Sequence, residues 1–357
     1  MKTKELKQAI TILKAGACHR VIQPILANVA LNGKMVTTDL DCWTIVDMPT
    51  GINTTASIFQ LDKLLKNVKT DEVAFSQDGH HLKVVAGSLK TTLKGMPVDE
   101  YPAVPSLDVK HALNLDGKRF LSAIKKLAYS VGDESQNILA GICLKVNKTG
   151  LEMASTDGSR LGKYTDPSVR SDESIEAVIP GQYLAAFHKS MQGNKDDHTI
   201  RLEIAPDMAS LRMGKVHFII RTLDGFYPVY NQLIPNPADA KHRLTFEKAD
   251  LEKAINQIKT FANPRTNVIR FEFEQGTLTL KTSTPDIGES EIALPYRASY
   301  QDGPLLTAFN YAYILDALKV IESDTVQLSM SEPLHPAILI GQDDPHYLAL
   351  IMPVQVK

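Results

Sequence analysis

Hydrophobic positions recur at helical spacing in six segments of the chain and alternate with polar positions in most of the segments between them. Leu6, Ile10 and Leu13, for example, fall on one face of a helix. The predicted helices cover residues 2–15, 61–68, 117–130, 182–191, 249–261 and 311–321. The predicted strands cover residues 25–31, 35–38, 56–59, 73–76, 81–86, 89–93, 142–153, 268–273, 278–282, 326–329, 337–340 and 347–352.

The order of these elements repeats along the chain, because each helix is followed by a group of strands. Three corner segments carry an aspartate, at Asp39, Asp157 and Asp286, and they lie roughly 120 positions apart. The sequence therefore predicts an α+β fold of three repeated domains, residues 1–110, 111–237 and 238–357. Each domain is expected to contain two half-units, each a helix with an antiparallel sheet.

The corner from Thr156 to Leu161 has turn chemistry, since its aspartate can accept bonds from backbone amides and Gly158 can take a positive φ. A tight hairpin corner is the simplest interpretation of this segment taken alone. The segment indicates more than a turn because related corners occur elsewhere in the chain.

Composition places the chain among soluble globular proteins of two or three domains, with 357 residues of which 43% are hydrophobic and 22% charged. No apolar run approaches the roughly 20 residues that span a bilayer. The apolar stretch at residues 9–13 is short and Lys14 interrupts it, so we expect neither a signal peptide nor a membrane partner. Three cysteines (Cys18, Cys42 and Cys143) in no ligand-like cluster suggest reduced thiols and a cytoplasmic location.

Charge is distributed unevenly between the predicted elements. The helices and their flanks carry more than twice as many basic as acidic residues, while the remainder of the chain is net negative. Such an arrangement would attract a polyanion to one side, and a phosphate backbone is the obvious partner. Twelve helices of about 10 Å each could line a ring with a hole near 28 Å, enough for a duplex, whereas six could not. One chain would then be half of a closed ring, completed as a homodimer.

Several motifs, in their order and spacing, resemble the bacterial-type β sliding clamp, the processivity subunit of the replicative DNA polymerase. The resemblance covers essentially the whole chain. It is carried by residues 23–28 (QPILAN), 37–41 (TTDLD), 155–161 (STDGSRL), 224–228 (DGFYP), 233–235 (LIP), 309–313 (FNYAY) and 351–354 (IMPV).

The resemblance implies a ring-shaped homodimer that encircles duplex DNA without sequence specificity. An ATP-driven clamp loader would place the ring, which would tether the replicative polymerase and other clamp-motif proteins. The family has no catalytic residues, cofactor or metal. Arg20, Lys125, Lys126 and Lys189 are the expected DNA contacts, and Phe261 is expected at the dimer interface.

The resemblance also implies a hydrophobic pocket between domains 2 and 3 that binds a partner peptide. We expect Arg160 to order the corner through its backbone carbonyls. Three departures from the family pattern, Ser159, Gln232 and Ile138, affect the expected peptide preference. The pocket residues are expected to be Leu139, Thr156, Gly158, Arg160, Leu161, Pro228, Leu233, Asn310, Tyr313, Met352, Pro353 and Val354.

Two other classes of protein compete with this interpretation. For an enzyme, the pairs Asp39/Asp41, Asp196/Asp197, Asp343/Asp344 and His80/His81 are conceivable ligands, but none has metal-site spacing with a third partner. The sequence also contains no GxxxxGK[ST], HExxH, GxSxG or GxGxxG motif. A repeat scaffold that binds only proteins is the second alternative, and a low-salt duplex-binding assay would separate it from a clamp. Trp43 is expected to pack in a core rather than stack on a base.

Overall fold

The computed structural model describes residues 1–17, 23–192 and 199–355. Within these ranges the chain packs as two compact units. The first unit comprises residues 1–124 and 179–224, and the second comprises residues 125–178 and 225–357. Helix α3 (Gly117–Leu127) carries the chain from the first unit into the second.

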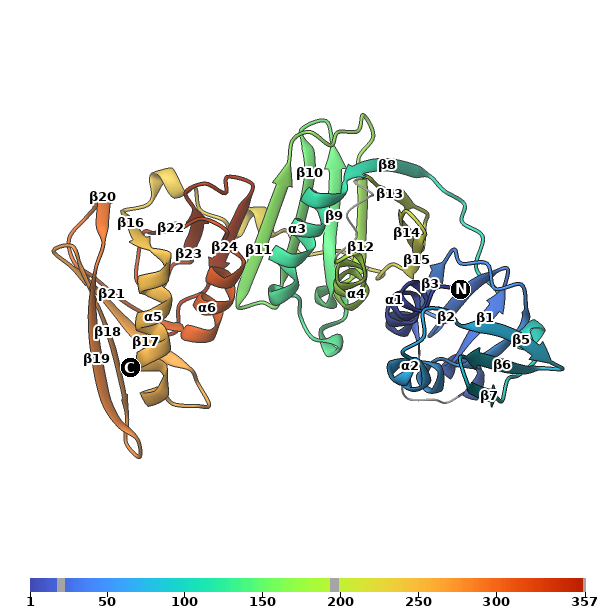
Figure 1. Ribbon diagram of the computed structural model, residues 1–357. Coiled ribbons are helices and arrows are strands. Elements are labelled where there is room, and N and C mark those ends of the chain that lie inside the picture. The colour runs from blue at the N-terminus through green and yellow to red at the C-terminus, as the bar shows by residue number, and fades with distance from the viewer. Residues whose placement is uncertain (18–22, 193–198, 356–357) are drawn as a thin grey trace. The chain divides into compact units, whose positions relative to one another are not determined.

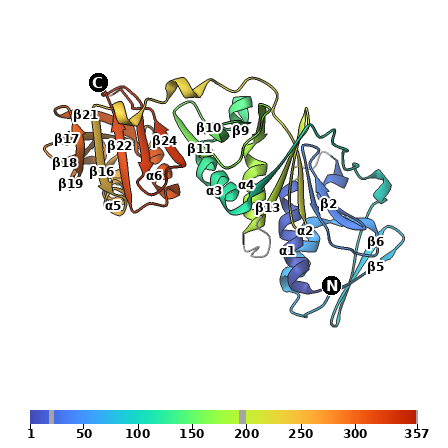
Figure 2. The same cartoon turned by 90° about the horizontal axis from the view of Figure 1, so that it is seen from above.

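The first unit is built on an eight-stranded antiparallel sheet and a separate three-stranded sheet. The larger sheet has the order β4 (Asn53–Ser57), β1 (Asn28–Asn32), β2 (Lys34–Thr38), β3 (Cys42–Val46), β15 (Val216–Arg221), β14 (Met208–Met213), β13 (Thr199–Ile204) and β8 (His111–Asp116). The smaller sheet has the order β5 (Ala74–Asp78), β6 (His81–Ala86) and β7 (Leu89–Leu93). Helices α1 (Thr3–Leu13) and α2 (Ile58–Asn67) lie side by side, and α4 (Gly181–Met191) contacts α1 (Figure 1, Figure 2).

The second unit contains a nine-stranded sheet and a four-stranded sheet. The larger sheet has the order β12 (Ile175–Pro180), β9 (Gly141–Asn147), β10 (Gly150–Thr156), β11 (Arg160–Asp166), β24 (Tyr347–Ile351), β23 (Ala337–Gly341), β22 (Thr325–Met330), β16 (His242–Glu247) and β20 (Arg297–Gln301). The smaller sheet has the order β19 (Gly288–Pro295), β18 (Thr277–Thr284), β17 (Val268–Glu274) and β21 (Leu305–Asn310). Helix α5 (Lys248–Ile258) runs along the four-stranded sheet and packs against α6 (Tyr311–Val320) (Figure 1).

Strand order reveals the internal repeat that the sequence predicted. Three groups of four strands, each after a helix, have the last strand of the group beside the first: β4-β1-β2-β3, β12-β9-β10-β11 and β21-β17-β18-β19. In the third group β20 intervenes before β21 and pairs with β16 instead. In each group the corner aspartate lies in the connection between the second and third strands. The α+β clamp fold is therefore confirmed. The domain boundaries at residues 110 and 237 stay a prediction.

The helices form where the amphipathic pattern predicted them, and their apolar stripes face a sheet. In α5 the buried positions are Leu251, Ala254, Ile255 and Ile258, one helical face at the i, i+3, i+4, i+7 spacing. In α2 the Ser57 hydroxyl accepts a bond from the Gln60 amide and so caps the helix start. This cap begins the helix at Ile58, so the prediction of a strand through Phe59 was wrong at its end.

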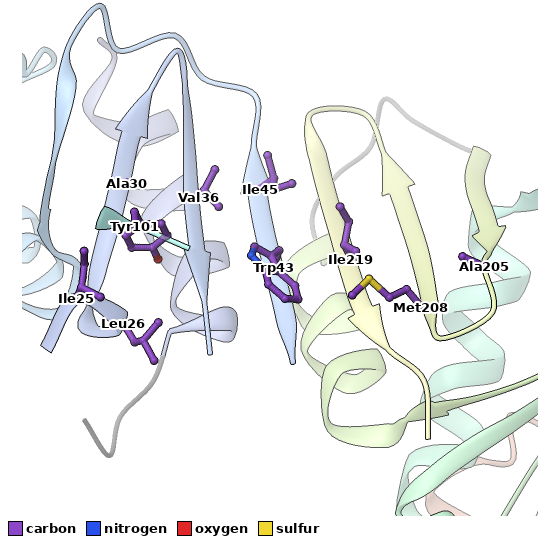
Figure 3. Packing of buried hydrophobic residues seen from close by; sticks show 10 residues of the cluster. All are labelled: Ile25, Leu26, Ala30, Val36, Trp43, Ile45, Tyr101, Ala205, Met208 and Ile219. Carbon is purple, nitrogen blue, oxygen red and sulfur yellow. The ribbon is translucent and has the colours of Figure 1, made fainter. Parts of the chain in front are cut away.

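Trp43 packs in the core of the first unit, as expected. Its side chain is 5% exposed and lies with Val36 and Ile45 on one side and with Ile219 and Met208 on the other (Figure 3). The strands that carry these residues, β3 and β15, pair side by side with Trp43 opposite Ile219. The single tryptophan therefore packs at the junction between two groups of strands, β1 to β4 and β13 to β15, that are distant in sequence.

Candidate functional site

The corner from Thr156 to Leu161 joins β10 to β11 and is held by its own side chains. Asp157 Oδ1 accepts bonds from the Ser159 amide at 2.9 Å and the Arg160 amide at 3.1 Å. Thr156 Oγ1 donates to the Arg160 carbonyl at 2.7 Å. Gly158 has φ +90°, which a residue with a side chain would adopt only under strain. The corner is thus a fixed, glycine-dependent turn.

The C-terminal tail returns to this corner. Strand β24 pairs with β11, Ile351 lying opposite Arg160. Beyond the strand, the Met352 amide donates to the Ser159 carbonyl at 3.0 Å, and the Val354 amide donates to the Ala308 carbonyl at 2.8 Å. The tail is therefore tied on one side to the corner and on the other side to β21.

A groove of about 440 Å³ lies beside the tail. Its lining combines apolar side chains with a few polar groups, which suits an anchor residue of a bound peptide. The lining residues are Ser159, Thr266, Val268, Asn310, Tyr313, Met352, Pro353, Val354 and Gln355. Five of the predicted pocket residues are thus brought together: Asn310, Tyr313, Met352, Pro353 and Val354.

The groove also contains residues that the sequence did not indicate, Thr266 and Val268. Val268 lies opposite Asn310 in the β17–β21 pair, and the Asn267 carbonyl accepts a bond from the Tyr311 amide. Asn310 caps helix α6, its Oδ1 accepting a bond from the Ala312 amide at 3.0 Å. The start of α6 and the start of β17 therefore form one wall.

The other seven predicted pocket residues do not line this groove. Thr156, Gly158, Arg160 and Leu161 build the corner beside it, and the side chain of Leu161, in β11, is buried. Leu139 is half-buried at the end of the 3₁₀ segment Glu134–Ala140. Pro228 and Leu233 are exposed on the segment that follows residue 224.

That segment is anchored to the same sheet as the corner. Tyr230 donates to Glu152 at 2.6 Å, and Asn231 donates to the same carboxylate at 3.0 Å. Lys163 forms an ion pair with Glu152 at 2.6 Å. Burial acts to raise the pKa of Glu152, but these donors outweigh it and the pKa is lowered. The segment that carries Pro228 and Leu233 is consequently tied to β10 and β11 through Tyr230 and Asn231.

Arg160 does not order the corner through backbone carbonyls, and that expectation was wrong. Its guanidinium instead donates to the carboxylates of Asp157 and Asp316, each at 2.8 Å. Burial acts to lower the pKa of Arg160, but the bonds to Asp316 and Asp157 outweigh it, so the pKa is raised. Two carboxylates satisfy a planar donor fork better than carbonyls do, which accounts for the difference.

The four cationic residues predicted to contact DNA have different surroundings. Lys125 and Lys189 are exposed. Lys126 is 4% exposed and forms an ion pair with Asp344 at 2.5 Å, which corrects the expectation of a DNA contact there. Arg20 lies outside the described residues. Phe261, the predicted dimer contact, is 37% exposed at the end of the 3₁₀ turn Lys259–Phe261.

Across residues 1–17, 23–192 and 199–355, no group of three or more His, Cys, Asp or Glu side chains could hold a metal ion. In the same ranges, no helix is both long and apolar enough to cross a membrane.

Comparisons with known proteins agree with the fold and with the motifs. Two models of the DNA polymerase III beta subunit match the chain, the central domain at residues 114–229 and the C-terminal domain at residues 231–355. A beta sliding clamp of Synechococcus elongatus is 26% identical over 374 residues, covering 100% of this chain and 98% of the relative.

Solved structures show the same fold. The DNA polymerase sliding clamp of Bacillus subtilis has a TM-score of 0.90 at 23% identity and covers 100% of this chain and 98% of that one. A Pseudomonas aeruginosa sliding clamp bound to griselimycin has a TM-score of 0.92 at 20% identity, with coverage of 100% and 98%. Together with the two family models, which span about two thirds of the sequence, these matches show that the chain belongs to the family of bacterial DNA polymerase III beta subunits, the β sliding clamps.

Proposed function

We propose that the protein acts in the cytoplasm as a homodimeric ring that encircles duplex DNA and tethers the replicative polymerase and other partners. Its role is non-catalytic, and an ATP-driven loader would open and place the ring. The observation that carries the proposal is the groove formed by the tail, the corner and the start of α6. Apolar side chains there lie beside a few fixed polar groups, as a peptide anchor requires.

The groove can supply useful affinity from a single anchor side chain. Burying a leucine or phenylalanine contributes roughly 1.5–3 kcal/mol, which corresponds to about a 10- to 150-fold change in Kd. Met352 is 38% exposed, so it presents apolar surface to a ligand. Pro228 and Leu233, exposed on the segment tied to β10 and β11, would offer apolar surface to a second anchor.

Deleting residues 352–357 tests the groove directly. The deletion removes Met352, Pro353 and Val354 but leaves intact β24, which ends at Ile351, and the helices α1 to α6. The truncated protein is expected to keep its oligomeric state and lose binding to a short labelled peptide with leucine and phenylalanine anchors, measured by fluorescence anisotropy. Tyr300→Ala is the matched control, since it removes an exposed apolar side chain from β20. If the truncated protein binds the peptide within about twofold of the full chain, a difference in binding free energy of less than 0.5 kcal/mol, the groove is not the site where partners bind.

Contact with DNA is proposed to be electrostatic and independent of sequence. Exposed Lys125 and Lys189, together with Arg20, would displace counterions from the phosphate backbone without reading bases. A loaded ring should then stay on circular DNA and slide off linear DNA. Equal retention on both would indicate adhesion rather than encirclement.

Closure of the ring is proposed to join edge strands of two chains. Strand β7 lies at one edge of its sheet and carries exposed Leu89 and Lys90, and β19 lies at one edge of its sheet and carries exposed Glu289 and Glu291. Unpaired edges of opposite charge can join as one continuous sheet. Exposed Phe261, beside β19 in space, would add apolar area to that contact.

A further inference from the structure

Arg160 is held in a cage of two carboxylates and two aromatic rings. Its side chain is 14% exposed, and its guanidinium donates to Asp157 from Nε and to Asp316 from one terminal nitrogen. The guanidinium carbon lies 4.5 Å from the Tyr313 ring centroid and 5.2 Å from that of Tyr129. Both distances lie within the range of cation–π attraction.

The cage joins two walls of the groove. Asp157 belongs to the corner, whereas Asp316 lies on α6 one turn after Tyr313, which lines the groove. Residues three apart on a helix point to the same side, so Asp316 and Tyr313 present one face to Arg160. The ion pair thus ties the groove-lining end of α6 to the corner, and the stacked guanidinium restricts the Tyr313 ring.

We propose that Asp316 is a positioning residue for peptide binding, acting through Arg160 to hold the Tyr313 ring in the orientation that lines the groove. This inference rests on the proposed function of the groove. Asp316 itself does not line the groove, and neither the sequence motifs nor the family comparison singled it out.

Loss of the Asp316 carboxylate has a defined consequence. Arg160 would keep its bond to Asp157 and lose the second anchor, so the guanidinium would no longer be fixed over Tyr313. A peptide would then have to immobilise the tyrosine ring on binding, which costs about 2- to 10-fold in affinity for one side chain. The loss should appear mainly as faster dissociation, since association depends little on local order.

Four variants test this. Peptide binding would be measured by fluorescence anisotropy for the unaltered protein and for four variants, with the labelled peptide that carries leucine and phenylalanine anchors. The variants are Asp316→Ala, Tyr313→Ala, the double variant and Asp316→Glu. Asp316→Ala is expected to weaken binding about 2- to 10-fold, and Asp316→Glu is expected to recover part of that loss. In the Tyr313→Ala background, Asp316→Ala should change affinity by less than about 1.5-fold, because its target is absent. Asp250→Ala, an exposed acid on α5, is the matched control and should bind normally.

Each other result overturns the inference. One such result is binding by Asp316→Ala as tight as that of the unaltered protein. The other is an equal loss of affinity with and without the Tyr313 ring, which would indicate a general structural role. If the unaltered protein fails to bind the peptide, the proposed function fails as well, so the two failures are distinguishable.

Discussion

Lys126 Nζ lies 2.5 Å from Asp344 Oδ2, with the two side chains only 5% and 9% exposed. Lys126 belongs to the last turn of α3, and Asp344 lies in the turn between β23 and β24. Beside them the Tyr129 and Tyr347 hydroxyls are 2.7 Å apart. A buried, hydrogen-bonded pair of this kind fixes where the end of α3 docks on the sheet.

Removing one partner of this pair should destabilise the second unit strongly. Asp344→Ala leaves the Lys126 ammonium buried without its main counter-charge, which typically costs about 3–5 kcal/mol. Replacing both residues with apolar ones, as in Lys126→Met with Asp344→Leu, is expected to cost much less. Chemical denaturation of the two variants checks the difference, and a double variant as unstable as the single one would contradict it.

The helices could be predicted from sequence because their signal is local. The predicted segment 182–191 differs from α4 (Gly181–Met191) by one residue, since its apolar stripe repeats within the segment itself. Strand β3 was missed for the opposite reason. All five of its residues, Cys42 to Val46, are buried, so the strand shows no alternation of polar and apolar positions. The strand predicted at 25–31 begins as the 3₁₀ segment Pro24–Ala27, where proline fixes the first residue.

The candidate site could be predicted only where a motif marks it. The tail and the corner were placed by their resemblance to a family. Val268, in contrast, joins the groove through its pairing with Asn310, which no local pattern reveals, and Thr266 lies two residues before it. Lys126 shows the same limit. Its charge suggested a surface contact, but its partner Asp344 lies 218 positions away in the chain.

The first unit should lose stability between pH 6.5 and about 4 because of His217. Burial, with help from nearby Arg212, lowers the pKa of His217 from 6.5 to about 4. The unfolded chain therefore binds a proton more readily than the folded one, so the contribution of His217 is complete above pH 6.5 and is lost as the pH falls toward 4. Its size should be on the order of 1–3 kcal/mol.

The measurement is the unfolding midpoint against pH for the unaltered protein and for His217→Gln, which keeps a neutral hydrogen-bonding group beside Ser210 Oγ. The difference between the two curves isolates His217 from the other titrating groups. A difference that stays constant from pH 7 to pH 4 would show that the imidazole does not titrate as described.

Charge reversal at exposed helix lysines should weaken DNA binding and make it less dependent on salt. Lys125→Glu with Lys189→Glu removes two of the cations that displace counterions. The negative slope of the logarithm of the DNA-binding constant against the logarithm of salt concentration should therefore become shallower by about 2. Lys148→Glu with Lys215→Glu, which reverses two exposed lysines in the β9–β10 and β14–β15 turns, is the control of equal net charge. Equal loss in the control would indicate that net charge, rather than the helix surface, governs binding.

The dimer should depend on the surface around Phe261. The chain has a mass of 39.4 kDa, so light scattering should report a particle of about twice that mass. Phe261→Glu places a charge where apolar area is proposed to be buried, and it is expected to yield monomers at micromolar concentration. Leu306→Glu is the control. It lies on β21, at the edge of the four-stranded sheet opposite β19, and should remain dimeric.

A second experiment tests the edge strands themselves. Glu289→Lys with Glu291→Lys should weaken self-association. Mixing that variant with one that carries Lys90→Glu should restore a contact between the two variants, since the charges are again opposite. Dimers that survive both the Phe261 and the glutamate changes would place the subunit contact elsewhere on the chain.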